Sequence, residues 1–421
     1  MTQSLARPAT DRQREARSTA FRRVREDVSL RINPDRCLRL RSRYSDCDRC
    51  AQACPPRVLL VNNERMELAD GCLRCGRCSA ACPTGALQTE GFAVNPPRAA
   101  EGPTPIYVDC WKVAACDSPR DALRVPCLGG IALHHLVQWH AACERRPIVL
   151  LDRGWCSQCS CGSGADHPAR ETLDAARTLL AELGVAEPAL PRFHNLPLPS
   201  TRMPAEIPDP LAAQPLSRRE FFSGMTRAAA RAVAPVVAGE GGERGPTGGA
   251  RLGKIEATTR SQLLAQSGAL GSRHGRPLPA ELFPALRLSD ACRNHQVCAV
   301  ACPTRALQPY TSDDGEAAGV VFDAWACIAC GDCTRACPER ALTLVPQGDG
   351  EVPRGPAALT RWTQRECYDC GHEFADSGSS NLCPSCRKTR ELVRTGFAES
   401  FGSALSPHGE PMRTETPVGT D

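Results

Sequence analysis

Aromatic side chains and long apolar runs are both scarce in this chain. Phe, Trp and Tyr make up only 5% of its 421 residues, although 42% are hydrophobic, and this is thin for one large core. The arginine-rich start, residues 1–32, lacks the apolar segment of a secretory signal, and no run of about eighteen apolar residues occurs. We therefore expect several small domains, no membrane span and a cytoplasmic location, where thiols stay reduced.

Nucleotide-binding loops are lacking too. We find no GxGxxG between a strand and a helix and no GxxxxGK[ST] loop. The formal net charge of +4 counts every cysteine as neutral, whereas a ligating cysteine is a thiolate. The holo protein is therefore expected to be acidic, and the sequence gives no reason to expect a nucleic-acid partner.

Cysteine, in contrast, is abundant, with 26 in the chain, and most of it falls in repeats. Residues 72–87 read CLRCGRCSAACPTGAL, residues 292–307 read CRNHQVCAVACPTRAL, and residues 327–342 read CIACGDCTRACPERAL. A divergent fourth copy, CDRCAQACPPRVL, spans 47–59. The copies form two pairs, so the repeating unit is a pair.

The spacing CxxCxxCxxxCP is typical of iron–sulfur ligation: three cysteines surround one [4Fe-4S] cluster, and the fourth, followed by proline, ligates a second cluster. Both pairs resemble bacterial dicluster ferredoxins, which implies a small βαβ pseudo-repeat and electron transfer. The resemblance implies two complete ligand sets and two sets of three cysteines. The complete sets are Cys54, Cys72, Cys75 and Cys78, and Cys302, Cys327, Cys330 and Cys333; the incomplete sets are Cys47, Cys50 and Cys82, and Cys292, Cys298 and Cys337.

Each pair has one irregular position. In the first pair the family's first cysteine position falls on Tyr44, and Cys37, seven residues earlier, would complete the set if the loop folds back. The alternatives are a [3Fe-4S] cluster or a free buried cysteine. In the second pair His295 stands at the second position. Either its imidazole ligates iron, or three thiolates hold a [3Fe-4S] cluster.

Between the pairs, residues 104–199 alternate strand-like and helix-like segments and predict a small α/β domain. Its cysteines follow the strands PIYVDC, ALRVPC and PIVLLD, and the carboxyl ends of parallel strands are where such sheets place their sites. Cys143 lies within a helical pattern and is expected in the core. The candidate ligands are Cys110, Cys116, Cys127, Cys156 and one of Cys159 or Cys161.

The strand order, the PCLGG turn and the late cysteine group of this domain resemble the delta subunit of methyl-viologen-reducing hydrogenases. That resemblance implies a [2Fe-2S] centre and a place where electrons are exchanged with a hydrogenase or a heterodisulfide reductase. A zinc site or reduced structural thiols remain the alternatives.

Two CxxC knuckles, Cys367 with Cys370 and Cys383 with Cys386, predict a structural zinc ribbon, with rubredoxin-like iron as the alternative. The fold class expected is α+β and multidomain. Its parts are a basic disordered tail (1–32), a first dicluster module (33–95), the cysteine-rich α/β domain (104–199), a linker with helices (200–284), a second dicluster module (285–347), the ribbon (360–392) and a disordered tail (401–421).

Residues 216–222, LSRREFF, resemble an opening found in accessory ferredoxins of periplasmic nitrate reductase. They also look like a twin-arginine export signature. Their place deep in the chain argues against export, and Ser217 with Glu220 fits a helix capping box. Two functions follow. The chain is either a polyferredoxin that relays electrons between a redox enzyme (hydrogenase, heterodisulfide reductase or molybdoenzyme type) and a carrier pool, or an accessory protein that helps assemble a metalloenzyme.

Overall fold

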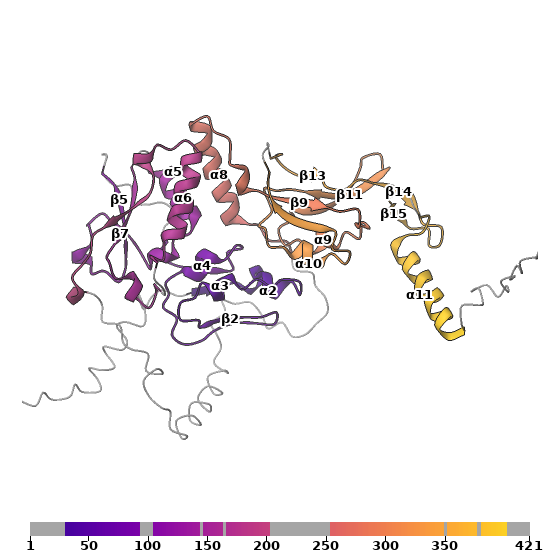
Figure 1. Cartoon of the computed structure of the whole chain (residues 1–421), viewed down its shortest axis with the longest axis horizontal. Helices are drawn as coiled ribbons and strands as arrows, with labels where there is room; N and C mark the ends of the chain where they lie inside the picture. The colour runs from indigo at the N-terminus through magenta and orange to yellow at the C-terminus, as the bar shows by residue number, and fades with distance from the viewer. Residues whose placement is uncertain are drawn as a thin grey trace, which may run out of the picture. The chain divides into compact units, whose positions relative to one another are not determined.

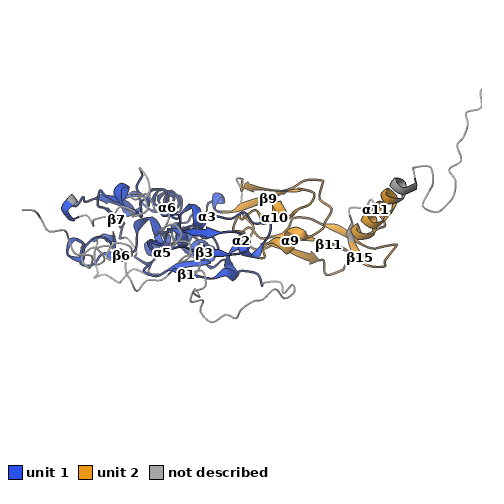
Figure 2. Ribbon diagram, turned by 90° about the horizontal axis from the view of Figure 1, so that it is seen from below, with its two compact units in different colours: residues 1–282 blue, residues 283–421 orange. Residues whose placement is uncertain are grey.

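The structure, a computed structural model, describes residues 30–92, 104–143, 146–162, 166–202, 253–348, 352–376 and 380–401. The segment 216–222 therefore lies outside the described residues, as do nearly all of the two predicted tails. The chain divides into two compact units, Met1–Leu282 and Phe283–Asp421 (Figure 2). Within the described residues, no helix is both long and apolar enough to cross a membrane.

The first module, residues 30–92, is built from very short elements (Figure 1). Its strands pair antiparallel as β1 with β4 and β2 with β3. Its small core joins Cys50 to Leu59 and Leu87, so cysteine side chains form part of the core itself. The elements are β1 (Leu30–Ile32), η1 (Pro34–Arg36), α2 (Leu38–Arg41), α3 (Arg49–Gln52), β2 (Leu59–Val61), β3 (Met66–Leu68), α4 (Arg77–Ala81) and β4 (Leu87–Thr89).

The middle domain, which begins at residue 104, has a four-stranded sheet in the order β6-β5-β7-β8, and every neighbouring pair is parallel. The three strands predicted from the sequence are present. Helices α5 and α6 pack on the sheet through Trp139 and Leu173, both almost fully buried. The elements are β5 (Ile106–Cys110), η2 (Ala115–Asp117), β6 (Leu123–Val125), η3 (Leu128–Gly130), α5 (Leu133–Ala142), β7 (Ile148–Asp152), η4 (Cys156–Gln158), α6 (Arg170–Glu182), η5 (Glu187–Ala189), β8 (Arg192–Asn195) and η6 (Ser200–Arg202).

The later part of the stretch interpreted as a linker belongs to the core of unit 1. Helix α8 (Thr258–Arg273) packs against α5, and its Leu270 joins Leu179 and Leu180 of α6 in one apolar cluster. Leu278 and Leu282, beside the short η7 (Ala280–Leu282), complete that cluster. The middle domain therefore comprises residues 104–202 and 253–282.

Unit 2 joins the second module, residues 283–348, to the ribbon, residues 352–401. Strand β11 pairs with β10 on one side and with β13 and β14 on the other, so the module and the ribbon share one antiparallel sheet. The elements are β9 (Pro284–Leu288), α9 (Val297–Ala301), β10 (Leu307–Thr311), β11 (Ala317–Phe322), α10 (Asp332–Ala336), β12 (Leu342–Pro346), β13 (Ala357–Ala358), β14 (Trp362–Glu366), β15 (Glu373–Asp376) and α11 (Pro384–Phe401).

Candidate iron–sulfur and metal centres

Three of the cysteine loops share an unusual backbone. In each loop the residues two and four places after the first cysteine are left-handed. Such turns direct backbone N–H groups into the loop and favour negative charge there, and Asn294 N lies 3.4 Å from the Cys292 sulfur. The three pairs of left-handed residues are Arg74 and Gly76, Asn294 and Gln296, and Ala329 and Gly331, with φ between 51° and 81°.

The turns that follow the CP cysteines are alike as well. The third residue after each CP cysteine is left-handed, with φ between 48° and 65°. The turn then brings a backbone amide onto the sulfur: Ala86 N lies 3.2 Å from Cys82 Sγ and Ala341 N lies 3.4 Å from Cys337 Sγ. The loops of Cys82, Cys302 and Cys337 therefore offer a backbone hydrogen bond to the sulfur, which favours a thiolate in a bound cluster. The left-handed residues are Arg57, Gly85, Arg305 and Arg340.

The first complete set lines one cavity of the first module. Cys54, Cys72, Cys75 and Cys78 all border it. Burial, followed by the charges of neighbouring cysteines, raises the pKa of Cys78 far above its usual value. Buried thiolates that lie close together repel one another, so these side chains stay protonated unless a cation lies between them. Binding of a cluster must therefore release their protons.

Cys37 is buried beside the incomplete set of the first module. Its neighbours include Cys47 and Cys82, whose charges raise its pKa after the larger effect of burial. Burial and then the charges of Cys82, Cys37 and Cys47 raise the pKa of Cys50 to about 12. The hydroxyl of Tyr44 instead accepts a hydrogen bond from the guanidinium of Arg43 at 2.7 Å. The structure thus places Cys37 among Cys47, Cys50 and Cys82.

In the second module the complete set also converges. Burial, then the charges of Cys327, Cys302 and Cys298, raises the pKa of Cys333 to about 12. Burial raises the pKa of Cys330 as well, with Asp332 and Cys302 among its neighbours. Helix α10 carries Cys333 and α9 ends directly before Cys302, so two short helices position this set.

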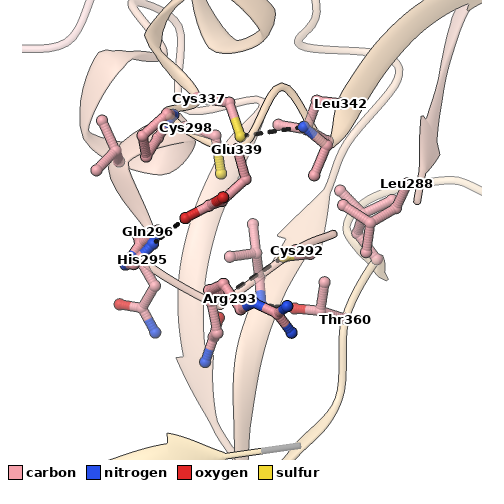
Figure 3. Close-up of a pocket in the computed structure, with 16 residues that line it drawn as sticks. Leu288, Cys292, Arg293, His295, Gln296, Cys298, Cys337, Glu339, Leu342 and Thr360 are labelled. Atoms are coloured by element: carbon pink, nitrogen blue, oxygen red, sulfur yellow. Dashed lines mark hydrogen bonds and ion pairs between the residues drawn. The ribbon is translucent and has the colours of Figure 1, made fainter. Parts of the chain in front are cut away.

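The incomplete set of the second module surrounds a separate cavity, shown in Figure 3. Burial and then the charges of Cys292 and Cys337 raise the pKa of Cys298 to about 11. His295 occupies the same backbone position as Cys75 and Cys330 in the other loops. Its Nε2 lies 3.2 Å from Oε1 of Glu339, which reaches over from the turn after Cys337 (Figure 3).

The ribbon cysteines lie closer together than any cluster allows. The sulfurs of Cys367, Cys370, Cys383 and Cys386 all fall within 4.8 Å of one another, and Cys370 Sγ lies 3.8 Å from Cys383 Sγ. A tetrahedron with metal–sulfur bonds of about 2.3 Å has edges of about 3.8 Å. The distances therefore fit a single metal ion. An ion pair, with 2.8 Å between Arg390 Nε and Asp369, holds α11 against the first knuckle.

In the middle domain four of the predicted cysteine ligands gather beside the carboxyl ends of the parallel strands, and Cys116 does not join them. Burial raises the pKa of Cys110 strongly, and Cys127, Cys159 and Cys156 are the cysteines whose charges add to it. These four line one cavity together with Cys161. Cys116 is exposed in η2 and is not among the residues that line the cavity. Cys143 is half-buried against the sheet core, as expected.

Arg153 lines this cavity and forms a buried ion pair with Asp109. Arg153 and Asp109 lie 2.6 Å apart and are 2% and 0% exposed. Asp109 also accepts hydrogen bonds from Cys110 N at 2.8 Å and from Ser118 Oγ at 2.7 Å. These bonds join the end of β5 to Ser118 and to Arg153, which follows β7, so the pair fixes the ends of two strands that precede cysteines of the site.

Two side-chain nitrogens face the sulfurs of this domain, and sequence reasoning missed both. Lys112 Nζ lies 3.0 Å from Cys159 Sγ, and His167 Nε2 lies 3.5 Å from Cys156 Sγ. Asp152, Cys156 and His167 also bring possible ligand atoms within 4.8 Å of one another. His167 Nδ1, however, accepts a hydrogen bond from Ala169 N at 3.2 Å. In a neutral ring Nε2 then carries the proton and donates to Cys156.

Comparison with protein families gives two matches. Residues 69–88 match a 4Fe-4S binding domain, and residues 319–373 match a 4Fe-4S dicluster domain. The chain contains two 4Fe-4S ferredoxin-type domains. No curated protein matches the chain.

The second ferredoxin-type match begins within β11 and ends after the first ribbon knuckle, so it includes Cys327 to Cys337 but also Cys367 and Cys370. In the structure those last two cysteines group with Cys383 and Cys386. Cys302, which precedes the match, lies with the ferredoxin-type set. The grouping of these cysteines in the structure therefore differs from the range of the family match, which omits Cys302 and includes two ribbon cysteines.

Proposed function

We propose that the chain is an iron–sulfur electron-transfer protein, a polyferredoxin that relays electrons between a redox enzyme and a carrier pool in the cytoplasm. The observation that carries this proposal is the convergence of four cysteine sets in loops whose left-handed turns aim amides at sulfur. A [4Fe-4S] cluster held by four thiolates takes up and releases single electrons and offers no open iron to a substrate.

The residues present suit four ferredoxin-type clusters. Cys37 completes the irregular set of the first module, and we infer a [3Fe-4S] cluster at the His295 site, because His295 Nε2 is engaged by Glu339. Cys110, Cys127, Cys156 and Cys159 supply the four thiolates that a [2Fe-2S] centre needs. The four ribbon cysteines suit one zinc ion.

The test is metal analysis and EPR spectroscopy of anaerobically purified full-length protein. About fifteen irons are expected in the ferredoxin-type sites, two more in the middle domain and about one zinc. An oxidised [3Fe-4S] signal and reduced [2Fe-2S] and [4Fe-4S] signals should accompany them. Iron below about eight per chain would overturn the two-module proposal.

The partner is expected to be a redox enzyme of hydrogenase, heterodisulfide reductase or molybdoenzyme type. A cell that lacks the chain distinguishes electron transfer from assembly. Lost electron flux with a fully loaded partner enzyme supports electron transfer. A partner enzyme that is poor in cofactor would instead assign the chain to the accessory role.

A further inference from the structure

Cys161 is a buried cysteine that belongs to none of the proposed ligand sets. This side chain is 2% exposed and packs in one cluster with Cys75 of the first module and Cys127 of the middle domain, with Cys159 at the edge. One thiol therefore contacts sulfurs of two different centres.

The contact is built into the packing of unit 1. Arg77, two residues after Cys75, donates to the carbonyl oxygens of Cys161 at 3.0 Å and Gly162 at 2.9 Å. Gly130, in the PCLGG turn, lies so close that a Cβ there would stand 2.3 Å from the Cys75 carbonyl oxygen. The glycine of this turn thus allows the cluster loop of the first module to approach the middle domain.

Side-chain nitrogens lie in direct contact with the sulfurs of the middle site. Lys112, a cation, and His167, an N–H donor, each face one of its sulfurs. Hydrogen bonds and positive charge at the sulfurs of an iron–sulfur centre stabilise its reduced form and so raise its reduction potential.

We propose that Cys161 is the junction through which the [4Fe-4S] centre ligated by Cys75 and the middle-domain [2Fe-2S] centre exchange electrons, and that Lys112 and His167 make the middle centre the acceptor. One electron leaves the ferredoxin-type centre, which is oxidised, and reduces the middle centre; no bond forms and no proton is transferred. The inference rests on the proposed function, and specifically on a redox centre in the middle domain.

The first experiment measures the magnetic interaction between the two reduced centres by EPR relaxation in the dithionite-reduced full chain. In the wild-type protein the [2Fe-2S] signal should relax faster than an isolated centre does. Gly130→Ala should weaken this effect, measured in samples that retain the iron content of the wild type, whereas Gly268→Ala, whose Cβ would meet only ordinary contacts, should not. Equal relaxation in the wild type and Gly130→Ala would overturn the junction.

Cys161→Ala removes the thiol without a steric wedge, so it tests the junction even if Gly130→Ala does not fold. We expect unchanged iron, which also shows that Cys161 is no ligand, and at least a tenfold slower reduction of the middle centre in stopped-flow mixing. Cys143→Ala is the matched control. Loss of two irons, or an unchanged rate, would overturn the role given to Cys161.

The second experiment measures reduction potentials in Lys112→Met and His167→Phe, with the exposed Lys388→Met as control. Each of the first two changes should shift the reduction equilibrium of the middle centre about tenfold toward the oxidised form, equal to about 59 mV for one electron. Unchanged potentials would refute the assigned direction. A protein with reduced cubane signals but no [2Fe-2S] signal would overturn this inference alone, whereas a protein without iron would overturn the proposed function.

Discussion

The first and second modules use the same cysteine loop and fill its irregular position differently. In the first module the displaced Cys37 folds back among Cys47, Cys50 and Cys82. In the second, His295 takes a cysteine position and pairs with Glu339. The modules also differ in their neighbours, because the first packs against a parallel-sheet domain and the second shares its sheet with the ribbon. A common loop thus permits sites of unlike chemistry.

The largest effect is expected from removing the metal ion that we propose for the ribbon. Binding of a structural zinc ion supplies about 10–16 kcal/mol to the folding of small zinc domains. Cys383→Ala should therefore lose the ion and unfold residues 352–401, seen as missing zinc and rapid proteolysis there. The exposed Cys116→Ala serves as control, and full zinc retention in Cys383→Ala would contradict the ribbon assignment.

The contribution of the buried Asp109–Arg153 ion pair to the stability of unit 1 is tested by Asp109→Ala. This change leaves Arg153 buried without its partner, and breaking a buried pair in this way costs about 3–5 kcal/mol. Urea unfolding followed by tryptophan fluorescence should show the loss, while the exposed Asp121→Ala should be close to neutral. A cost below about 1 kcal/mol, as for a surface pair, would show that the network does not hold the site.

Cys37→Ala should make the first module resemble the second. Removing the fourth thiolate should cost one iron per chain and add an oxidised [3Fe-4S] signal. Iron analysis and EPR measure both, with the half-buried Cys143→Ala as control. Unchanged iron in Cys37→Ala would mean that Cys37 is not a ligand.

His295→Cys should have the opposite result, because it restores the complete motif of the other loops. We expect one iron more per chain and loss of the [3Fe-4S] signal in EPR. His295→Ala should leave the iron content unchanged. Iron lost from His295→Ala would instead identify the imidazole as a ligand.

The smallest effect concerns pH. Burial, with neighbouring charges, raises the pKa of Cys50 and Cys333 to about 12, so both are neutral thiols at neutral pH. Cluster uptake needs thiolates and releases their protons, so uptake is favoured as the pH rises and opposed as it falls. Anaerobic reconstitution with iron and sulfide in weak buffer should acidify the solution, and more iron bound at about pH 6 than at about pH 8 would contradict this.

Local patterns made much of this protein predictable. The CxxCxxCxxxCP spacing already separates the ligand sets, because each loop is short and its turns follow from the motif. The strand-like runs predicted β5, β6 and β7, and with them the meeting of Cys110, Cys127 and Cys156 at one end of the sheet. Cys37 was a candidate because it lies only seven residues before Tyr44, the position where the motif lacks a cysteine.

Contacts between distant segments were not predictable. His167 lies 11 residues from Cys156 with no motif between them, and helix α8 gives no sign in its sequence that it completes the core of the middle domain.

The sequence by itself therefore limited each set of cysteines to a few kinds of centre, since ligand type and spacing set which metals a loop suits. The tertiary structure alone decided which centres adjoin. Cys75 and Cys161 are 86 positions apart in the chain, and they meet because Gly130 leaves room for the cluster loop and Arg77 bonds to the carbonyl groups across the contact. Such packing depends on the shape of two folded surfaces, which no local pattern records.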